Sequence, residues 1–248
     1  MTQPTLILVP CLSGAPWRAE QLTALQDLPL VTFRLDDAHR DIEGHVDDLL
    51  TLAEPYRPYV LVGDSFGAQV ALAAATRQPP GLVGLVMSGG FAATPIDDLA
   101  TKLKVWAAGF LPGALYRNLV LPMHADLLKS RFDDAGDRGW SRDRTLELFR
   151  DETTWQGYVR RTRAAMSADY RRALGEVQVP TLILTPEDDT LIGPDAARVM
   201  RDGIAGAQEE IIETSGHMFR FSHPRAFAQA IRDFLEHRSL LDARRVAA

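Results

Sequence analysis

Four stretches of the chain consist almost entirely of apolar residues, with no polar residue at alternate positions. They cover residues 5–9, 59–62, 82–87 and 181–184. Such runs are typical of parallel strands that are covered on both faces, because a half-exposed strand alternates apolar and polar residues. We therefore expect four buried strands here. The short segments at residues 30–33 and 209–212 predict two more strands.

Helical patterns separate these runs. Residues 41–53 place Ile42, Val46 and Leu49 on one face of a helix. Further helices are predicted over residues 17–25, 194–201 and 224–236, the last with Ser222 as its cap, and over the alanine-rich segment that ends before Pro79. Strands and helices thus alternate, which indicates an α/β protein with a doubly wound, mostly parallel sheet of about six strands.

The alternation breaks between residues 91 and 176, where no convincing strand is found. Helices are predicted there over residues 96–110, 143–151 and 154–165. The segment holds 14 basic and 12 acidic residues, so it is nearly neutral, whereas the whole chain has a net charge of −6. We interpret residues 91–176 as a helical cap (lid) insertion over the sheet. Residues 1–90 and 177–248 then form the core domain.

Composition narrows the classes of function. A net charge of −6 predicts no general attraction to nucleic acid or to an anionic membrane. The single cysteine, Cys11, excludes a disulfide within the chain and fits a reducing compartment. The first apolar run is too short for a signal peptide or a membrane span, so we expect a cytoplasmic protein. No Cys/His cluster has metal-ligand spacing, and neither a metal nor a cofactor is expected.

The strongest candidate for chemistry is the sequence Gly63-Asp64-Ser65-Phe66-Gly67. It lies between a predicted strand and a predicted helix, as the nucleophile elbow G-x-S-x-G requires. A Cβ at either flanking position would collide with neighbouring backbone, so both positions need glycine. The positive end of the following helix dipole would face the serine hydroxyl. Ser65 is therefore the predicted nucleophile, and an ordinary surface turn is the alternative.

A serine nucleophile needs a histidine to take its proton and a carboxylate to orient that histidine. In a parallel sheet, both belong just after the carboxyl ends of strands. His217 is the only one of the six histidines that follows both a strand and a glycine. The other five are interpreted as surface or core residues. The acidic run Glu187-Asp188-Asp189 follows the strand at residues 181–184, and position alone leaves all three carboxylates open.

Three motifs of the chain resemble those of the α/β-hydrolase superfamily, in particular its small capped serine carboxylesterases. The run at residues 180–189, Pro-Thr-Leu-Ile-Leu-Thr-Pro-Glu-Asp-Asp, is similar to P-T-L-v-l-x-G-x-x-D, whose last aspartate is catalytic. Residues 216–224 match G-H-x(6)-P, and residues 6–12 resemble the oxyanion loop l-l-P-G-L. The resemblance runs nearly end to end and implies an α/β-hydrolase core, with the insertion where the family has its cap.

The resemblance also implies roles for particular residues. The catalytic triad would be Ser65, His217 and Asp189, with Asp188 as the alternative acid. The backbone N–H groups of Leu12 and Phe66 would form the oxyanion hole. The chain departs from the family pattern at three positions, none of them in the triad, where it has Pro186, Ser222 and Cys11.

These features together predict a serine hydrolase that cleaves a carboxylic ester or thioester of a small, partly apolar substrate through an acyl-enzyme. A C–C bond hydrolase or a lyase on the same triad stays open, as does a slow hydrolase that serves as a ligand receptor. A dinucleotide site is excluded because no G-x-G-x-x-G follows the first strand. A carrier protein as partner is conceivable but has no support in the sequence.

The insertion is expected to supply the substrate pocket. Most of its large apolar residues should form the core of the cap, and the rest should line an apolar acyl pocket over Ser65. These residues are Trp106, Phe110, Leu111, Leu115, Tyr116, Leu119 and Trp155. We interpret the arginine-rich part, which includes Arg161 and Arg163, as a solvated face rather than a docking site for an acidic carrier.

Overall fold

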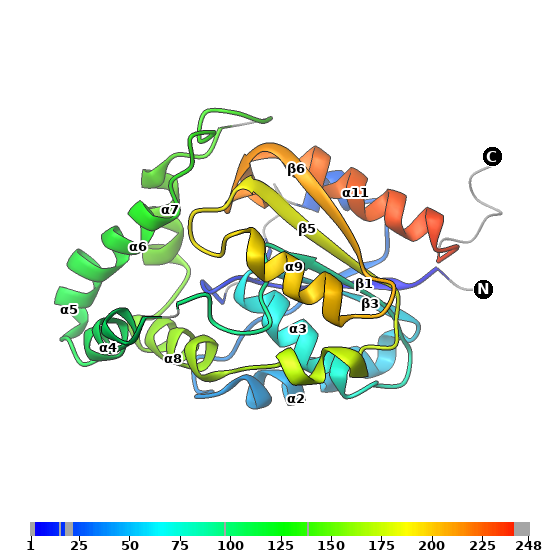
Figure 1. The fold of residues 1–248 in the computed structure, drawn as a ribbon, viewed down its shortest axis with the longest axis horizontal. Helices are drawn as coiled ribbons and strands as arrows, with labels where there is room; N and C mark the ends of the chain where they lie inside the picture. Colours follow the sequence, from blue (N-terminus) through cyan, green and yellow to red (C-terminus); the bar gives the residue numbers. More distant parts are fainter. Residues whose placement is uncertain (1–2, 15, 18–21, 97, 138, 241–248) are drawn as a thin grey trace.

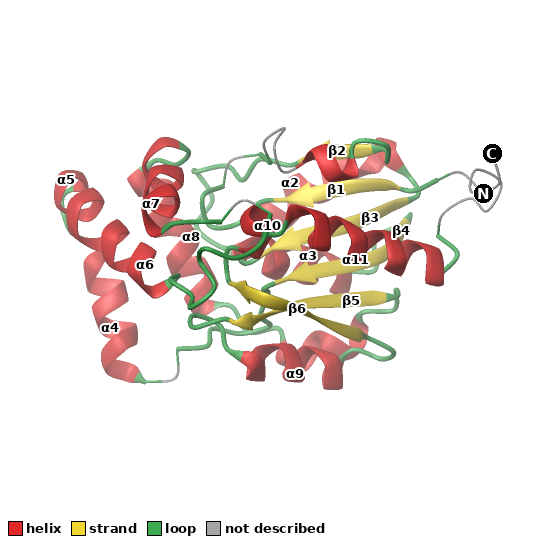
Figure 2. Ribbon diagram, turned by 90° about the horizontal axis from the view of Figure 1, so that it is seen from above, coloured by secondary structure: helices red, strands yellow, loops and turns green. Residues whose placement is uncertain are grey.

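Six parallel strands form a single sheet in the order β2-β1-β3-β4-β5-β6 (Figures 1 and 2). The structure is a computed structural model that describes residues 3–14, 16–17, 22–96, 98–137 and 139–240. The strands are β1 (Thr5–Val9), β2 (Leu30–Thr32), β3 (Tyr59–Asp64), β4 (Leu82–Ser88), β5 (Thr181–Asp188) and β6 (Gln208–Gly216). After β1, the chain adds β2 on one side of it and then β3 and the later strands on the other side. Open α/β sheets bind ligands at such a switch point, which here lies between β1 and β3.

Helices cover both faces of this sheet (Figure 1). On one face lie α2 (Ile42–Ala53), α3 (Phe66–Thr76) and α9 (Pro194–Gly203), and on the other lies α11 (Pro224–His237). Successive residues of β1 point into different cores: Ile7 joins the α2, α3 and α9 side, whereas Leu8 joins the α11 side. This confirms the interpretation of the apolar runs as strands buried on both faces, and with it the predicted fold class.

Helices also fill the segment between β4 and β5. They are α4 (Leu99–Ala108), α5 (Gly113–Leu115), the π-helical turn η3 (Tyr116–Val120), α6 (Leu121–Leu127), α7 (Arg142–Asp151), α8 (Trp155–Ser167) and the 3₁₀ helix η4 (Arg171–Glu176). Among the described residues of this segment, the only β pairing is an isolated bridge between Ala93 and Asp169. The carboxyl ends of the strands face α4 to α8 (Figure 2). The division into a core and a cap domain at the stated bounds stays a prediction.

Several predicted boundaries differ from the structure. Helix α4 begins at Leu99 rather than at residue 96, and the helical stretch from Gly113 to Leu127 was not predicted. Ser222 does not cap α11, which begins after His223 without a side-chain cap. Instead, the Ser222 hydroxyl is hydrogen-bonded to Nδ1 of His223 at 2.8 Å.

Two predictions fall partly outside the described residues. Of the helix expected over residues 17–25, the described residues show a helical Leu22 followed by the 3₁₀ helix η1 (Thr23–Leu25), and residues 18–21 are not described. Residues 241–248 of the predicted terminal tail are likewise not described. None of the described helices combines the length and the apolar character needed to cross a bilayer.

Candidate active site

Ser65 occupies the sharp turn between β3 and α3. Its φ of 53° and ψ of −113° are unusual for a residue with a side chain. A Cβ on Gly63 would lie 2.4 Å from the Gly67 carbonyl oxygen, and a Cβ on Gly67 would lie 2.4 Å from the carbonyl oxygens of Val9 and Pro10. Both glycines are therefore required, as predicted, because strand and helix pass too closely for any side chain between them.

Strand pairing brings the remaining candidate residues to this turn. Val9 is in register with Gly63, so the loop after β1 runs beside the elbow. Asp188 is in register with Gly216, so the residues that follow these two, Asp189 and His217, lie next to each other. The two late motifs thus meet because their strands are neighbours in the sheet.

A chain of hydrogen bonds links the three candidate side chains. His217 Nε2 lies 3.0 Å from Ser65 Oγ, and His217 Nδ1 lies 2.7 Å from Asp189 Oδ2. The other carboxylate oxygen of Asp189 accepts hydrogen bonds from the backbone N–H groups of Leu191 at 3.0 Å and Ile192 at 2.9 Å. Both side chains are almost fully buried, with 6% of His217 and 3% of Asp189 exposed.

The other two carboxylates of the acidic run point elsewhere. Asp188 Oδ2 accepts hydrogen bonds from the Ser130 hydroxyl and from the Arg131 backbone N–H, each at 2.8 Å. Glu187 accepts from the Arg131 side chain at 2.9 Å and from the Thr214 backbone N–H at 2.8 Å. Of the three acids that position left open, only Asp189 contacts His217.

Electrostatics favour a charged aspartate beside a basic histidine. Burial disfavours the protonated imidazole, but the charge and hydrogen bond of Asp189 and the charge of Asp64 outweigh it, so the pKa of His217 is raised. Burial also disfavours ionised Asp189, but the charge of His217 and three hydrogen bonds outweigh it, so its pKa is lowered. Asp189 therefore stays ionised, and His217 is a stronger base than a free histidine.

This arrangement predicts the pH dependence of hydrolysis. Activity should be present at higher pH and lost as the pH falls through the raised pKa of His217, because only the neutral imidazole can accept the serine proton. His124 should add no second limb to the pH profile near the pKa of His217, because burial and the charge of His217 lower the pKa of His124 to about 4. A kcat/KM profile from about pH 5 to 9 checks this, and an acid limb below the ordinary histidine pKa of about 6.5 would contradict it.

The two candidate oxyanion donors lie beside Ser65. Leu12 and Phe66 both line the pocket that contains Ser65 and His217. Within the described part of the chain, neither backbone N–H has a hydrogen-bond acceptor. Phe66 is the first residue of α3, so its N–H is one of those that a helix leaves unpaired. Both groups are thus available to a ligand oxygen.

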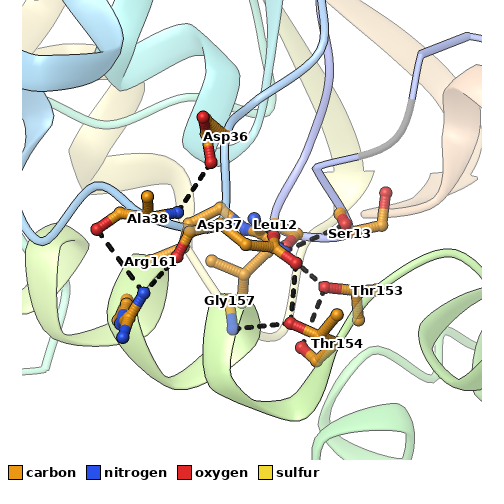
Figure 3. Close-up of polar contacts among 10 residues, drawn as sticks. Leu12, Ser13, Asp36, Asp37, Ala38, Thr153, Thr154, Gly157 and Arg161 are labelled. Carbon is orange, nitrogen blue, oxygen red and sulfur yellow. Dashed lines mark hydrogen bonds and ion pairs between the residues drawn. The ribbon is translucent and has the colours of Figure 1, made fainter.

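An arginine of α8 holds the Leu12 loop in place (Figure 3). Arg161 of α8 is only 1% exposed and donates from Nε to the Leu12 carbonyl at 2.8 Å and from Nη2 to the Ser13 carbonyl at 3.1 Å. It also pairs with Asp37 at 2.5 Å and donates to the Thr153 hydroxyl. The interpretation of Arg161 as part of a solvated face was therefore wrong, because its guanidinium is buried among loop carbonyls.

We expect Arg161→Met to lower both stability and turnover. Unpaired loop carbonyls should cost about 1–3 kcal/mol in the free energy of unfolding. Displacing the Leu12 N–H should lower kcat by about 10- to 100-fold, less than outright loss of an oxyanion donor. Urea unfolding and ester hydrolysis measure the two effects. Arg163→Met is the control, because Arg163 lies on the same helix and contacts Trp106 and Phe110 instead. A stability loss with unchanged kcat would show a purely structural role.

A buried ion pair joins the elbow to the histidine loop. Arg220 Nη2 lies 2.9 Å from Asp64 Oδ2, and both side chains are less than a tenth exposed. Arg220 also lies over the rings of Trp17 and Phe221 at 4.2 and 4.0 Å from their centroids. The sequence suggested no role for this pair. It ties together the turns that hold Ser65 and His217.

Cys11 is a buried free thiol next to this pair. Its Sγ lies 3.4 Å from Ser13 Oγ and 3.8 Å from Arg220 Nη2. Burial and the charge of Asp64 raise the pKa of the thiol. It therefore stays protonated at neutral pH and acts as a small hydrophobic residue of the pocket wall.

A pocket of about 280 Å³ opens over Ser65 between the strand ends and the helices from α4 to α8. Its wall is mostly apolar, with Phe91, Val105 and Met166 among its residues. Of the seven cap residues expected in the cap core or the pocket, Tyr116 lines the pocket, and Leu111 and Trp155 contact the cap core. The other four are about half exposed or more, which corrects that expectation. They are Trp106 at 53%, Phe110 at 64%, Leu115 at 47% and Leu119 at 53%.

The described residues contain one group with metal-ligand geometry. Ligand atoms of Asp36, His39 and Asp48 lie within 4.8 Å of one another. His39 Nε2 is already paired with Asp48 Oδ2 at 2.7 Å. None of the three lines the pocket over Ser65. The group therefore has no part in the chemistry of that pocket.

Comparison with known proteins identifies the family. A model of the alpha/beta hydrolase family matches residues 6–230, so the chain belongs to this family. The chain is 26% identical over 185 residues to 2-hydroxy-6-oxononadienedioate/2-hydroxy-6-oxononatrienedioate hydrolase 2 of Pseudomonas putida, an alignment that covers 71% of this chain and 62% of that protein. The chain thus spans less than two thirds of the length of that relative.

Two further matches agree with this assignment. Pimeloyl-(acyl-carrier protein) methyl ester esterase of Neisseria meningitidis is 27% identical over 197 residues, which cover 79% of this chain and 76% of that protein. The structure of a thermophilic esterase from Thermogutta terrifontis superposes with a TM-score of 0.80 at 18% identity and covers 96% of this chain and 91% of that one. At this identity, the structural match shows the shared fold.

Proposed function

We propose that the protein is a serine hydrolase that cleaves an ester or thioester of a small, partly apolar acid. The observation that carries the proposal is the hydrogen-bonded chain from Asp189 through His217 to Ser65 at the base of an apolar pocket. Nucleophile, base and orienting acid within hydrogen-bond reach are the signature of an activated serine. In this proposal, Ser65, His217 and Asp189 are the catalytic residues.

The proposed reaction has two halves. Ser65 Oγ attacks the carbonyl carbon while His217 Nε2 takes the proton of the serine hydroxyl. The C–O or C–S bond to the leaving group then breaks as His217 gives that proton to the leaving group. Water then attacks the acyl-enzyme by the same route in reverse. The Leu12 and Phe66 N–H groups stabilise the negative oxygen of each tetrahedral intermediate, and Asp189 stabilises the imidazolium.

The pocket and the relatives support a small-molecule substrate. A mostly apolar wall and a volume of about 280 Å³ suit a short acyl chain. The Neisseria relative is named for a substrate on an acyl-carrier protein, so we include thioesters and carrier-linked acids among the substrates to be tested. The buried free thiol of Cys11 fits a reducing compartment, and we propose that the protein acts in the cytoplasm.

Steady-state hydrolysis of p-nitrophenyl esters from acetate to octanoate tests the proposal, with acyl thioesters in parallel. We expect many turnovers per enzyme molecule. We also expect a preference for one acyl chain length, because the volume of the pocket is limited to about 280 Å³. A single turnover followed by tight retention of the product would instead indicate a receptor. Failure on all esters and thioesters, together with cleavage of a vinylogous diketone, would indicate a C–C bond hydrolase.

A further inference from the structure

Helices α6 and α8 place a hydrogen-bonded polar pair in the mostly apolar pocket. His124 of α6 and Tyr158 of α8 both line the pocket that contains Ser65 and His217. The side chains are joined by a hydrogen bond between His124 Nδ1 and the Tyr158 hydroxyl. His124 had been interpreted as a surface or core residue, but it lies in the wall of the pocket. No step of the proposed reaction uses this pair.

Aromatic neighbours hold both rings in place. The His124 ring stacks on Phe149 with centroids 5.3 Å apart and an angle of 22° between the planes. Tyr158 meets His124 edge to face at 5.6 Å and Phe149 at 5.3 Å. Such contacts leave the imidazole little freedom to rotate. Its two nitrogens therefore have fixed surroundings.

The environment of Tyr158 decides which nitrogen of His124 carries the proton. Tyr158 is only 1% exposed, and burial raises the pKa of its phenol well above the ordinary value. The phenol is thus protonated, and a buried O–H must donate. Among the described residues, its one hydrogen-bond partner is His124 Nδ1. Burial and the charge of His217 lower the pKa of His124 to about 4, so the ring is neutral at pH 7. A neutral ring that accepts at Nδ1 carries its hydrogen on Nε2.

The Nε2–H group of His124 is a hydrogen-bond donor that has no acceptor among the described residues. His124 is only partly buried as a residue and lines the pocket. A donor in a mostly apolar wall loses its partner when a purely apolar ligand displaces water, and that loss disfavours such a ligand.

We infer that His124 Nε2–H is a specificity-determining donor that binds a second oxygen on the substrate. The inference rests on the proposed hydrolase function and narrows its substrate class. The preferred ester or thioester then carries a carbonyl or hydroxyl oxygen in addition to its scissile carbonyl, and Tyr158 is the positioning residue that sets the tautomer of His124.

Matched substrates test this inference. The kcat/KM of p-nitrophenyl hexanoate is compared with that of its keto analogues, in each of which one chain methylene is replaced by a carbonyl. We expect at least one keto ester to be preferred by about 3- to 10-fold, the worth of one neutral hydrogen bond. His124→Phe and Tyr158→Phe should each abolish that preference. Met166→Leu changes the same wall away from both rings and should retain the preference. Equal rates at every keto position, or a preference that persists in His124→Phe, would overturn the inference.

A measurement without turnover separates this inference from the proposed hydrolase. NMR of nitrogen-labelled histidine should show His124 as the Nε2–H tautomer, with its signal assigned by its loss in His124→Phe. Tyr158→Phe should convert it to a mixture of tautomers. An Nδ1–H tautomer in the native protein would overturn the inference even if esters are hydrolysed. Conversely, absence of hydrolysis in the native protein would defeat the proposed hydrolase, whatever the tautomer.

Discussion

Replacing Ser65 by alanine is expected to lower kcat for ester hydrolysis by about 10⁶-fold, the loss seen when a triad serine is removed. The reason is that no other hydroxyl in the described structure is hydrogen-bonded to His217. The fold should be unaffected, because alanine can occupy the turn between Gly63 and Gly67 with the side chain pointing into the pocket. Initial rates and a thermal unfolding curve measure the two parts of this prediction.

Covalent labelling provides the control for that experiment. A fluorophosphonate probe should label the native protein at Ser65 and should not label Ser65→Ala. Ser130→Ala is a matched variant that removes a hydroxyl from outside the pocket, where Ser130 is bonded to Asp188. It should be labelled as the native protein is. Labelling that persists in Ser65→Ala would show that the nucleophile is a different residue.

The buried part of the sheet was predictable because consecutive apolar residues are costly unless both faces are covered. β1 has the predicted bounds, Thr5–Val9. β5 and β6 run on to Asp188 and Gly216, four residues beyond their predicted ends. The hydrogen-bond ladder continues there into polar sequence, which an apolar pattern does not detect. Those extra residues are the ones that bring the acidic run to the histidine loop.

The helical stretch from Gly113 to Leu127 escaped prediction because only a small part of it is buried. Leu115 and Leu119 are about half exposed, and no residue of α4 is fully buried. Pro122 lies in the first turn of α6, where a helix tolerates proline. An apolar stripe that faces solvent and a proline within a continuous helix both weaken the pattern from which a helix is inferred.

The candidate triad was foreseen from local motifs, whereas the residues that support it were not. Ser65 and His217 each stand in a short motif at the end of a strand, so the few residues around each of them are enough to identify it. Arg161 acts on the carbonyl of Leu12, 149 residues earlier in the chain. Nothing in the sequence around Arg161 distinguishes it from Arg160 and Arg163 of the same helix, which are only partly buried. Only the tertiary structure shows that its guanidinium is buried.

The prediction with the next largest effect concerns the acid beside His217. Asp189→Asn should lower kcat by about 10⁴-fold, as in a triad whose aspartate becomes an amide. Asparagine cannot stabilise the imidazolium and can donate to Nδ1, which then places the proton on the nitrogen that faces Ser65. The kcat should therefore fall far more than the affinity for substrate. Rates measured at saturating ester report the change directly.

Asp188→Asn is the matched control, since it changes the adjacent carboxylate in the same way. Asp188 is bonded to Ser130 and Arg131 rather than to His217, so its loss should affect the junction with the cap and leave most of the turnover. The two variants should also differ in pH dependence. Asp189 is the main contributor that raises the pKa of His217 against the effect of burial, so the residual activity of Asp189→Asn should have its acid limb at lower pH. In Asp188→Asn the limb should not move. If Asp188→Asn lost more activity than Asp189→Asn, or if the limb moved in Asp188→Asn alone, Asp188 would be the acid that serves His217.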